Sequence, residues 1–399
     1  MTLWAGRVGG ELAPEVWEFL KADDAELLPY DILGTLLHAE RLHAAGLLTT
    51  PELENVRSTL AGVADVDPAA EDVHSFLEER LGDVGRKIHA GRSRNDQVAT
   101  AFRLYVGAAC TQADAGLVAL AHTVLVRADQ EAETPMPGYT HLQRAIGVTV
   151  GHHLLAWVEM LERDRARFAA AAASAAPSPL GAGALAGSTL PLPPPPNPMR
   201  NSLDAVADRD FALDYLYATA ACFAHLSRIG EELVLWTTSE FGFARLPETA
   251  ATGSSMMPQK LNPDVAELVR GKAGTAIGRL TGLLATVKSL PLSYNRDLQE
   301  DKPPVFAARA DLNGALAALR ALIDGLELDR ERMAAACADP LLRATDAAEN
   351  LVREGVPFRD AHEQVAATVR AGTFEAPPAG DRLGDVRGAV AAAKARWSR

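Results

Sequence analysis

The stretch that decides the fold is QVATAFRLYVGAACTQADAGLVALAHTVLVRADQE, residues 97–131. It runs for 35 positions without a proline, and its apolar residues recur at helical spacing. A continuous helix of this length would extend about 52 Å at roughly 1.5 Å per residue. We therefore expect a single helix here that is much longer than the helices of ordinary globular domains.

Similar runs follow, and together they predict five long helices, at residues 97–131, 149–176, 203–239, 263–289 and 304–328. No alternating strand pattern of any length separates them, so the sequence predicts an all-α fold built as an elongated bundle of long helices. Some runs, such as LVALAHTVLV, are apolar around most of the helix. Such helices must be buried on more than one side, so we expect other subunits to complete the bundle.

Shorter helical patterns flank these long runs at both ends of the chain. We expect an N-terminal helical domain over residues 1–91, a central long-helix domain over 92–335 and a shortened C-terminal helical domain over 336–399. Residues 179–200 are too rich in glycine and proline for a helix and predict an extended connector.

Charge and composition narrow the class of function. The chain has 399 residues and a formal net charge of -13, which argues against nucleic acid or an anionic membrane surface as its main partner. The N-terminus lacks a basic region followed by an apolar run, and no stretch of about 18 uninterrupted apolar residues occurs. We expect a cytoplasmic protein that acts on a small molecule, without a metal site.

A Ser-rich loop tied to a helix start stands out at residues 253–263, GSSMMPQKLNP. Asn262 can cap the helix that follows, and Pro263 suits its first position. Lys260 lies at the junction. Helix N–H groups and an ammonium therefore meet where an anion or a developing oxyanion could bind.

The loop by itself leaves three functions open. It could be a mobile linker, because Gly, Ser and Pro crowd into it. Ser254 or Ser255 could be a nucleophile activated by Lys260, as in Ser–Lys hydrolases, or a base whose alkoxide is stabilised by the loop. Glu267, four residues after Pro263, could orient an imidazole from elsewhere in the chain.

Three further polar clusters interrupt the helical runs. GRSRNDQ at 91–97 carries arginine forks suited to carboxylates, although the solvated cap of a long helix has the same composition. PGYTHLQRA at 137–145 places a histidine beside a hydroxyl residue, as proton transfer near pH 7 requires, although a lone histidine is more often structural. PLSYNRDLQEDKPP at 291–304 is either a donor array for an anionic ligand or a charged turn between two helices.

The loop GSSMMPQKLNP resembles the signature loop of the fumarase/aspartase superfamily. The surrounding sequence narrows this resemblance to argininosuccinate lyase and its eye-lens relative δ-crystallin. The matches follow the expected order over most of residues 30–370 and include YDILGTLLHAERL, EDVHSFLEERL, KIHAGRSRNDQVAT, MPGYTHLQRA, SPLGAGALAG, NSLDAVADRDF, SEFGFARLPETAATGSSMMPQKLNPDVAELVRGKAG, LPLSYNRDLQEDK and VREGVPFRDAHE. Matches of this extent are far more specific than any single motif.

The resemblance implies a homotetramer of mostly helical subunits, with the long-helix bundle at its centre and each active site assembled from three chains. It also implies a reaction, the elimination of arginine from argininosuccinate to give fumarate, as part of arginine biosynthesis. This reaction would pass through an aci-carboxylate intermediate and would need no cofactor and no metal.

The resemblance further implies which residues transfer protons. Ser254 matches the serine that abstracts the Cβ proton of the substrate. His141, with Thr140 beside it, matches the partner region that is proposed to help protonate the leaving guanidinium. Glu267 matches the carboxylate that holds this histidine.

Other matched positions stabilise charge or bind the substrate. Lys260 and Asn262 match residues that stabilise the carbanion-like aci-carboxylate. A proton alpha to a carboxylate is weakly acidic, so its removal requires such stabilisation. The matched substrate-binding positions are Ser93, Arg94, Asn95, Tyr294, Gln299 and Lys302.

The chain departs from the family pattern in several places. At residues 6–10, GRVGG, the family usually has Phe and a small hydroxyl residue after the Gly-Arg pair; Ala90 replaces a Thr, and Leu261 replaces a Lys. The segment after Gly187 is shortened, and we expect the family's C-terminal region, with its Gly-Gly-Thr element, to be absent. These differences leave room for a paralogous lyase that releases fumarate from another N-substituted aspartate, or for a catalytically silent crystallin-like homologue.

Overall fold

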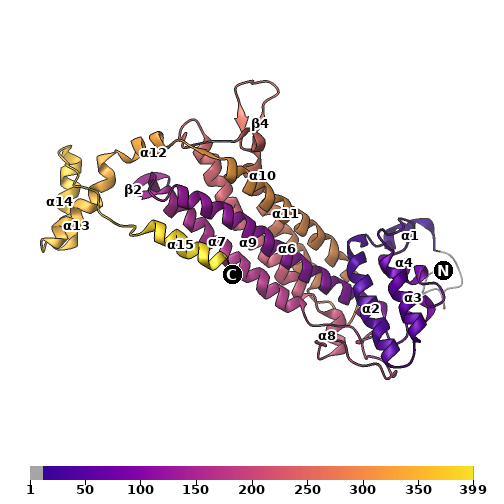
Figure 1. The fold of residues 1–399 in the computed structure, drawn as a ribbon. Coiled ribbons are helices and arrows are strands. Elements are labelled where there is room, and N and C mark those ends of the chain that lie inside the picture. Colours follow the sequence, from indigo (N-terminus) through magenta and orange to yellow (C-terminus); the bar gives the residue numbers. More distant parts are fainter. Residues whose placement is uncertain (1–11, 399) are drawn as a thin grey trace. The chain divides into compact units, whose positions relative to one another are not determined.

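The computed structural model describes residues 12–398, so the departure at residues 6–10 lies outside the described residues. Long helices dominate the structure, which confirms the all-α prediction (Figure 1). They are α6 (Arg94–Gln130), α7 (Val150–Ala175), α9 (Asp210–Thr237), α10 (Asp264–Val287) and α11 (Lys302–Gly325). Four of these five helices begin and end within three residues of the predicted bounds.

The remaining long run is divided in two. Instead of one helix over 203–239, the structure has α8 (Ser202–Ala207) and then α9, so the prediction of a continuous helix is wrong there. Asp208 ends α8 with φ -59° and ψ 131°, outside the helical region. Its carboxylate accepts a hydrogen bond from the buried guanidinium of Arg103. Helical periodicity continues across this break, so the sequence pattern did not reveal it.

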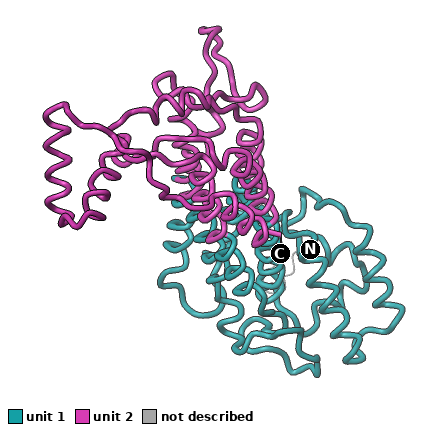
Figure 2. The backbone as a smooth tube through the Cα atoms, turned by 60° about the vertical axis from the view of Figure 1, so that its left-hand side comes forward, with its two compact units in different colours: residues 1–114, 165–221, 274–313 teal, residues 115–164, 222–273, 314–399 magenta. Residues whose placement is uncertain are grey.

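The chain forms two compact units, which Figure 2 shows in different colours. Unit 1 comprises residues 1–114, 165–221 and 274–313, and unit 2 comprises residues 115–164, 222–273 and 314–399. All five long helices contribute residues to both units. The three-domain division proposed from the sequence stays a prediction.

Aromatic rings hold the long helices together within unit 1. Phe102 of α6 lies edge-on to Phe211 of α9, with ring centroids 5.3 Å apart, and 6.5 Å from Phe306 of α11. Phe168 of α7 lies 5.9 Å from Tyr215 of α9. These rings are buried, and such pairs each contribute about 0.5–1.5 kcal/mol beyond the burial of their area.

Short helices near the N-terminus complete unit 1. They are α1 (Pro14–Leu20), α2 (Leu28–Ala44), α3 (Thr50–Ala61), α4 (Val73–Arg80) and α5 (Gly85–Ile88). Helix α3 is capped by Thr49, whose hydroxyl accepts from the Glu52 N–H while the Glu52 carboxylate accepts from the Thr49 N–H. Thr49 stands directly before the helix and Pro51 lies in its first turn, where a missing N–H costs little.

Unit 2 combines the other halves of the long helices with small antiparallel sheets. Trp157 of α7 stacks on Trp236 of α9, with centroids 5.5 Å apart. Within residues 12–398, three short two-stranded sheets lie between the helices of this all-α fold. They pair β1 (Pro135–Thr140) with β2 (Gln143–Thr149), β3 (Ala244–Arg245) with β6 (Glu327–Leu328), and β4 (Thr252–Gly253) with β5 (Leu261–Asn262).

The C-terminal part of unit 2 is made of the short helices that the sequence predicts. They are α12 (Arg330–Cys337), α13 (Ala344–Arg353), α14 (Phe358–Ala371) and α15 (Val386–Trp397). Within residues 12–398, α6 is long and apolar enough to cross a membrane by length and composition. The core helix of a soluble protein passes the same test, and 44% of the apolar window of α6 is buried inside the chain.

Candidate active site

The Ser-rich loop is a hairpin closed by the pairing of β4 with β5. Thr252 pairs with Asn262 and Gly253 with Leu261, which brings the ends of the loop together. The Ser254 Oγ accepts hydrogen bonds from the backbone N–H groups of Met256 (3.3 Å) and Met257 (3.0 Å). Two N–H donors aimed at a hydroxyl oxygen favour its ionised form, as a serine base requires.

Helix α10 leaves this hairpin at Asp264, one residue after the predicted start. The carboxylate of Asp264 accepts a hydrogen bond from the Thr252 hydroxyl and so ties the base of the hairpin to the helix. The Lys260 side chain is exposed, and its backbone N–H donates to the Met257 carbonyl at 3.1 Å. Ser254, Lys260 and Asn262 therefore come from one short segment, which the structure holds in a defined turn.

The predicted proton donor lies at the tip of the β1–β2 hairpin. Thr140 pairs with Gln143, so His141 and Leu142 form a two-residue turn between them. Both turn residues have φ 55°, in the left-handed region where residues other than glycine are strained. Thr140 and His141 are exposed. Strained backbone is concentrated at functional sites, so this turn is consistent with the role predicted for His141.

Glu267 lies on the first turns of α10 and is exposed. Its carboxylate lies 3.8 Å from the guanidinium of Arg270, which also binds Glu231. Within residues 12–398, no hydrogen bond or ion pair joins Glu267 to His141. A single chain therefore does not form the predicted carboxylate–histidine pair.

The six predicted substrate-binding residues all lie in unit 1 and surround two adjoining cavities. One cavity, of about 340 Å³, is lined by Ser93, Arg94, Asn95 and Tyr294. The other, of about 240 Å³, is lined by Arg94, Tyr294, Gln299 and Lys302. The fold thus brings together residues that lie about 200 positions apart in the sequence.

The start of α6 presents the first of these residues. The Ser93 Oγ accepts from the Asn95 N–H at 3.2 Å, and the Asp96 carboxylate accepts from the Ser93 N–H at 2.8 Å. This reciprocal arrangement caps the helix. The cap interpretation of GRSRNDQ and the binding interpretation are therefore both compatible with the structure.

The glycine-rich connector wraps around the same helix start. Asp96 is fully buried and accepts hydrogen bonds from the N–H groups of Gly181 (2.8 Å) and Gly183 (3.0 Å). Gly181 has φ 100°, and a Cβ there would lie 2.8 Å from Arg41. Only glycine fits this approach, which explains the Gly-rich composition of the connector.

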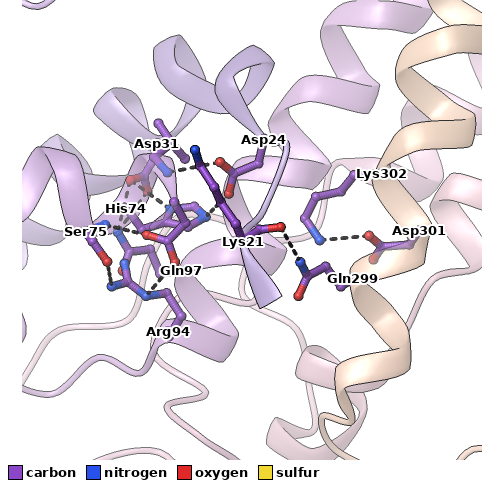
Figure 3. A network of polar contacts seen from close by, with 12 residues as sticks. Lys21, Asp24, Asp31, His74, Ser75, Arg94, Gln97, Gln299, Asp301 and Lys302 are labelled. Atoms are coloured by element: carbon purple, nitrogen blue, oxygen red, sulfur yellow. Dashed lines mark hydrogen bonds and ion pairs between the residues drawn. The ribbon is translucent and has the colours of Figure 1, made fainter. Parts of the chain in front are cut away.

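Arg94 is held from three sides. Its guanidinium donates to the Ser75 Oγ at 2.9 Å and to the Gln97 Oε1 at 3.3 Å, and it lies 3.7 Å from the Asp72 carboxylate. Burial would raise the pKa of the Asp72 carboxyl, but the cations of His74 and Arg94 hold it below its usual value. The side chain is thus preorganised at the cavity wall. Figure 3 shows Arg94 beside Ser75 and Gln97.

The segment 291–304 supplies the opposite wall. Gln299 donates to the carbonyls of Leu20 (3.3 Å) and Lys21 (3.4 Å), and so fixes the chain that follows α1. Burial raises the pKa of the Tyr294 hydroxyl. Lys302 is the first residue of α11 and donates to the Asp301 carboxylate at 2.8 Å.

A buried histidine at the cavity was not among the predicted site residues. His74 is 1% exposed, and its Nδ1 lies 2.9 Å from the Asp31 carboxylate while its Nε2 lies 3.8 Å from that of Asp24. Burial alone would lower the pKa of His74, but these carboxylates and Asp72 more than offset it and raise the pKa. Asp31 recurs at helical spacing with the buried polar residues Thr35 and His38 of α2, and this spacing is the signal in the sequence that could have revealed the cluster.

Some of the polar residues crowded between positions 74 and 97 are buried and hydrogen-bonded to α2, whereas Lys87 is exposed. Arg92 is 7% exposed, and its guanidinium donates to the Thr35 hydroxyl at 3.0 Å. Gln97 donates to both oxygens of Asp31, at 3.1 and 3.0 Å. Buried charges are tolerated when they are paired in this way.

Two family profiles match the chain. A profile described as "Lyase" matches residues 59–278, and one described as "Argininosuccinate lyase C-terminal" matches residues 341–378. The second match corrects part of the expectation about the family's C-terminal region, because residues 341–378 represent some of it. The Gly-Gly-Thr element does not occur in the sequence.

Curated relatives are similar to this chain over most of their length. The argininosuccinate lyase of Frankia casuarinae is 49% identical over 391 residues, which cover 92% of this chain and 84% of the relative. That of Anaeromyxobacter dehalogenans is 50% identical over 376 residues, covering 89% and 80%.

Solved structures agree with the fold. An EDDS lyase in complex with formate is 27% identical, with a TM-score of 0.78 over 97% of this chain and 85% of that one. A 3-carboxy-cis,cis-muconate lactonizing enzyme from Pseudomonas putida shares the fold, with a TM-score of 0.76 at 22% identity over 97% of this chain and 98% of that one. The chain therefore belongs to the argininosuccinate lyase family of the fumarase/aspartase superfamily.

Proposed function

We propose that this enzyme eliminates arginine from argininosuccinate and releases fumarate. The observation that carries the proposal is the 49% identity to an argininosuccinate lyase across 92% of the chain, which spans both groups of site residues. No specific observation favours a paralogous lyase or a catalytically silent homologue over this function.

Ser254 is the proposed base that removes the Cβ proton of the substrate. A serine hydroxyl is rarely ionised, so the base needs donors that stabilise its oxyanion. The N–H groups of Met256 and Met257 point at its Oγ and support this role. Lys260 and Asn262 follow in the same loop, where an ammonium and a helix start can stabilise the aci-carboxylate that forms.

His141 is proposed to protonate the leaving guanidinium, with Thr140 beside it and Glu267 holding the imidazole. The hairpin supports this role because its strained turn presents the histidine at an exposed tip. The cavities of unit 1 are proposed to bind the substrate through Ser93, Arg94, Asn95, Tyr294, Gln299 and Lys302. Arginine and lysine there suit the carboxylates of a succinyl group.

We further propose a homotetramer in which three chains build each active site. Elimination requires a site from which water is excluded, yet Thr140, His141 and Lys260 are exposed in the single chain. Helix α10 also exposes the large apolar side chains of Leu268 (61%) and Ile277 (52%). Neighbouring subunits that pack on α10 would bury these apolar side chains, and by covering the loop they would exclude water from the site.

The proposed chemistry uses side chains and backbone N–H groups for proton transfer and charge stabilisation, so it calls for no cofactor and no metal. The net charge of -13 supports neither nucleic acid nor an anionic membrane as a partner. We place the enzyme in the cytoplasm, where its proposed substrate is a small soluble metabolite.

Fumarate absorbance tests the reaction. Purified enzyme is incubated with argininosuccinate and, in parallel, with adenylosuccinate and aspartate. We expect fumarate from argininosuccinate only. Release from another adduct would establish the paralogous lyase, and no release from any of them by an intact oligomer would support a catalytically silent homologue.

Light scattering and subunit mixing test the assembly. The expected mass is about 170 kDa, four times the chain mass of 42.3 kDa, and a 42.3 kDa monomer would refute the tetramer. Ser254→Ala and Arg94→Gln chains are then unfolded together, refolded and assayed at a substrate concentration well below KM, where each variant alone has little activity. If different chains supply these residues, about one quarter of the wild-type activity returns. A mixture of Ser254→Ala with Lys260→Met is the control and stays inactive, because both residues lie in one loop.

A further inference from the structure

The ammonium of Lys302 is fixed at the cavity wall by its neighbour in the sequence. Its Nζ donates to the Asp301 Oδ1 at 2.8 Å and lies 5.6 Å from the centre of the Phe102 ring. Lys302 is 7% exposed and lines the 240 Å³ cavity. Figure 3 shows its contact with Asp301. The charge is therefore nearly desolvated except on its cavity side.

Asp301 also binds a second cation, Arg209. Its Oδ2 accepts a hydrogen bond from the Nε of Arg209, and the carboxylate is fully buried. Arg209 is 3% exposed and also donates to the carbonyls of Val206 (3.3 Å) and Asp208 (2.7 Å). One buried carboxylate thus lies between two buried cations, with one of its oxygens directed to each.

The ion pairs beside this cluster are formed by other residues. The Asp208 carboxylate pairs with Arg103, whose guanidinium lies over the Phe211 ring at 4.3 Å. On the other side of the cavity, Asp24 acts on both His74 and Lys302. Through its own contacts, the cluster of Arg209, Asp301 and Lys302 has two cations and one carboxylate, which is one positive charge in excess.

We propose that Asp301 is a positioning residue, which holds the Lys302 ammonium at the cavity and, because it shares its negative charge with Arg209, leaves Lys302 able to bind a carboxylate of the substrate. This inference rests on the proposed function, in which Lys302 binds the succinyl group. A lysine paired with a carboxylate of its own would be neutralised and would attract an anion weakly. A second cation on the same carboxylate restores the attraction, and the bound substrate then completes the charge balance.

The arrangement also sets the geometry. Pro303 and Pro304 follow Lys302 in the first turn of α11, where fixed φ angles hold the start of the helix. Asp301 ends the preceding 3₁₀ turn, residues Arg296–Asp301. Both partners of the ion pair are therefore anchored by rigid backbone, as a site that must bind one carboxylate in a fixed position requires.

Three variants test whether Asp301 positions Lys302 for substrate binding or only forms a structural ion pair with it. Asp301→Asn removes the anchor, and Arg209→Gln removes the second cation. Arg279→Gln breaks a partly buried ion pair with Asp311 (2.6 Å) in the same unit, at residues that do not line the cavity, and serves as the matched control. Thermal unfolding establishes that each variant is folded, and KM, kcat and the pH profile of kcat/KM are measured with argininosuccinate.

We expect KM to rise in both test variants, and we expect their pH profiles of kcat/KM to differ. In Asp301→Asn, KM rises about tenfold or more and the alkaline limb of kcat/KM moves to lower pH, because the ammonium loses its carboxylate and keeps the Arg209 cation nearby. In Arg209→Gln, KM rises about fivefold or more without a shift of that limb to lower pH, since Asp301 then neutralises Lys302. Asp301→Glu returns the limb toward its wild-type position. Arg279→Gln lowers the unfolding temperature but leaves KM and the limb unchanged.

The other titratable groups that line this cavity are the same in all variants; they are Lys21, Asp23, Asp24, Glu71, Asp72, His74, Arg94, Tyr294, Arg296 and Glu300. A folded Asp301→Asn enzyme with wild-type KM and pH profile would overturn the proposal. If Asp301→Asn does not fold, Arg209→Gln provides the test. An unchanged KM in folded Arg209→Gln would then refute the proposal that Asp301 shares its charge between Arg209 and Lys302. Wild-type turnover is scored first, so a failure of the proposed reaction is distinguished from a failure of this inference.

Discussion

The two groups of site residues differ in how much of their environment one chain supplies. In unit 2, Thr140, His141 and Lys260 are exposed on a hairpin and a loop, and few side chains contact them. In unit 1, the groups around Arg94 and Lys302 are paired and largely buried. We therefore propose that the predicted substrate-binding wall is preorganised within a chain, whereas the predicted proton-transfer groups obtain their final surroundings from neighbouring chains.

Ser254→Ala should produce the largest effect. We expect kcat to fall about 10³-fold or more with KM changed by less than about threefold, because the base acts in the transition state and contributes little to binding. Steady-state fumarate release measures both constants. Ser255→Ala is the matched control in the same loop and should retain activity within about threefold. Near-wild-type turnover of Ser254→Ala would show that Ser254 is not the base.

Arg94→Gln should act on binding instead. The change removes the guanidinium that contacts Ser75, Gln97 and Asp72, and we expect kcat/KM to fall about 10²-fold, mostly through KM. Arg86→Gln, at an exposed position of α5, is the control and should leave both constants unchanged. A loss confined to kcat would show that the two regions do not divide binding and proton transfer as proposed.

The buried network of unit 1 also predicts a pH dependence of stability. Burial and the Arg92 cation lower the pKa of His38 to about 3. Its Nε2 contacts the Ala90 carbonyl at 3.0 Å, and its Nδ1 contacts a guanidinium nitrogen of Arg41 at 3.3 Å, which fits a neutral ring with the proton on Nε2. The unfolded chain takes up a proton below about pH 6.5, whereas the folded chain does not.

This histidine should therefore destabilise the fold as the pH falls below about 6.5 and down to about 3. Between pH 8 and pH 5 we expect its share of the loss in the free energy of unfolding to be about 2 kcal/mol. Urea unfolding at both pH values measures the loss, and His38→Gln should reduce it by that amount. An equal loss in the variant would assign the pH dependence to other groups.

Leu142→Gly should have the smallest effect, and unlike the other substitutions it should stabilise the fold. Leu142 is 65% exposed and has φ 55°, so glycine relieves backbone strain and gives up little packing. We expect the free energy of unfolding to rise by up to about 1 kcal/mol in urea titrations. Leu47→Gly, at a more buried turn position outside the left-handed region, should lower it instead. A destabilised Leu142→Gly would show that the hairpin tip is held by contacts that the single chain does not reveal.

Local pattern predicted most of the fold. Helical periodicity located four of the five long helices to within three residues, because each helix repeats one short-range rule along its length. It failed at Asp208, where a buried ion pair with Arg103 breaks the helix, and at the β1–β2 hairpin, where the turn uses His141 and Leu142 in place of the usual glycine or asparagine. Both failures depend on contacts or strain that periodicity does not encode.

The sequence by itself determined the residue types of the site and their family, because the clusters around Ser254, His141, Arg94 and Tyr294 are short contiguous motifs. Only the tertiary structure decided which of them meet, since Arg94 and Lys302 approach the same cavity from segments about 200 residues apart. The tertiary structure alone also placed Asp24, Asp31 and His74 in one buried cluster and set Asp301 between Arg209 and Lys302. Charge balance depends on distance in space, and the order of residues along the chain does not specify it.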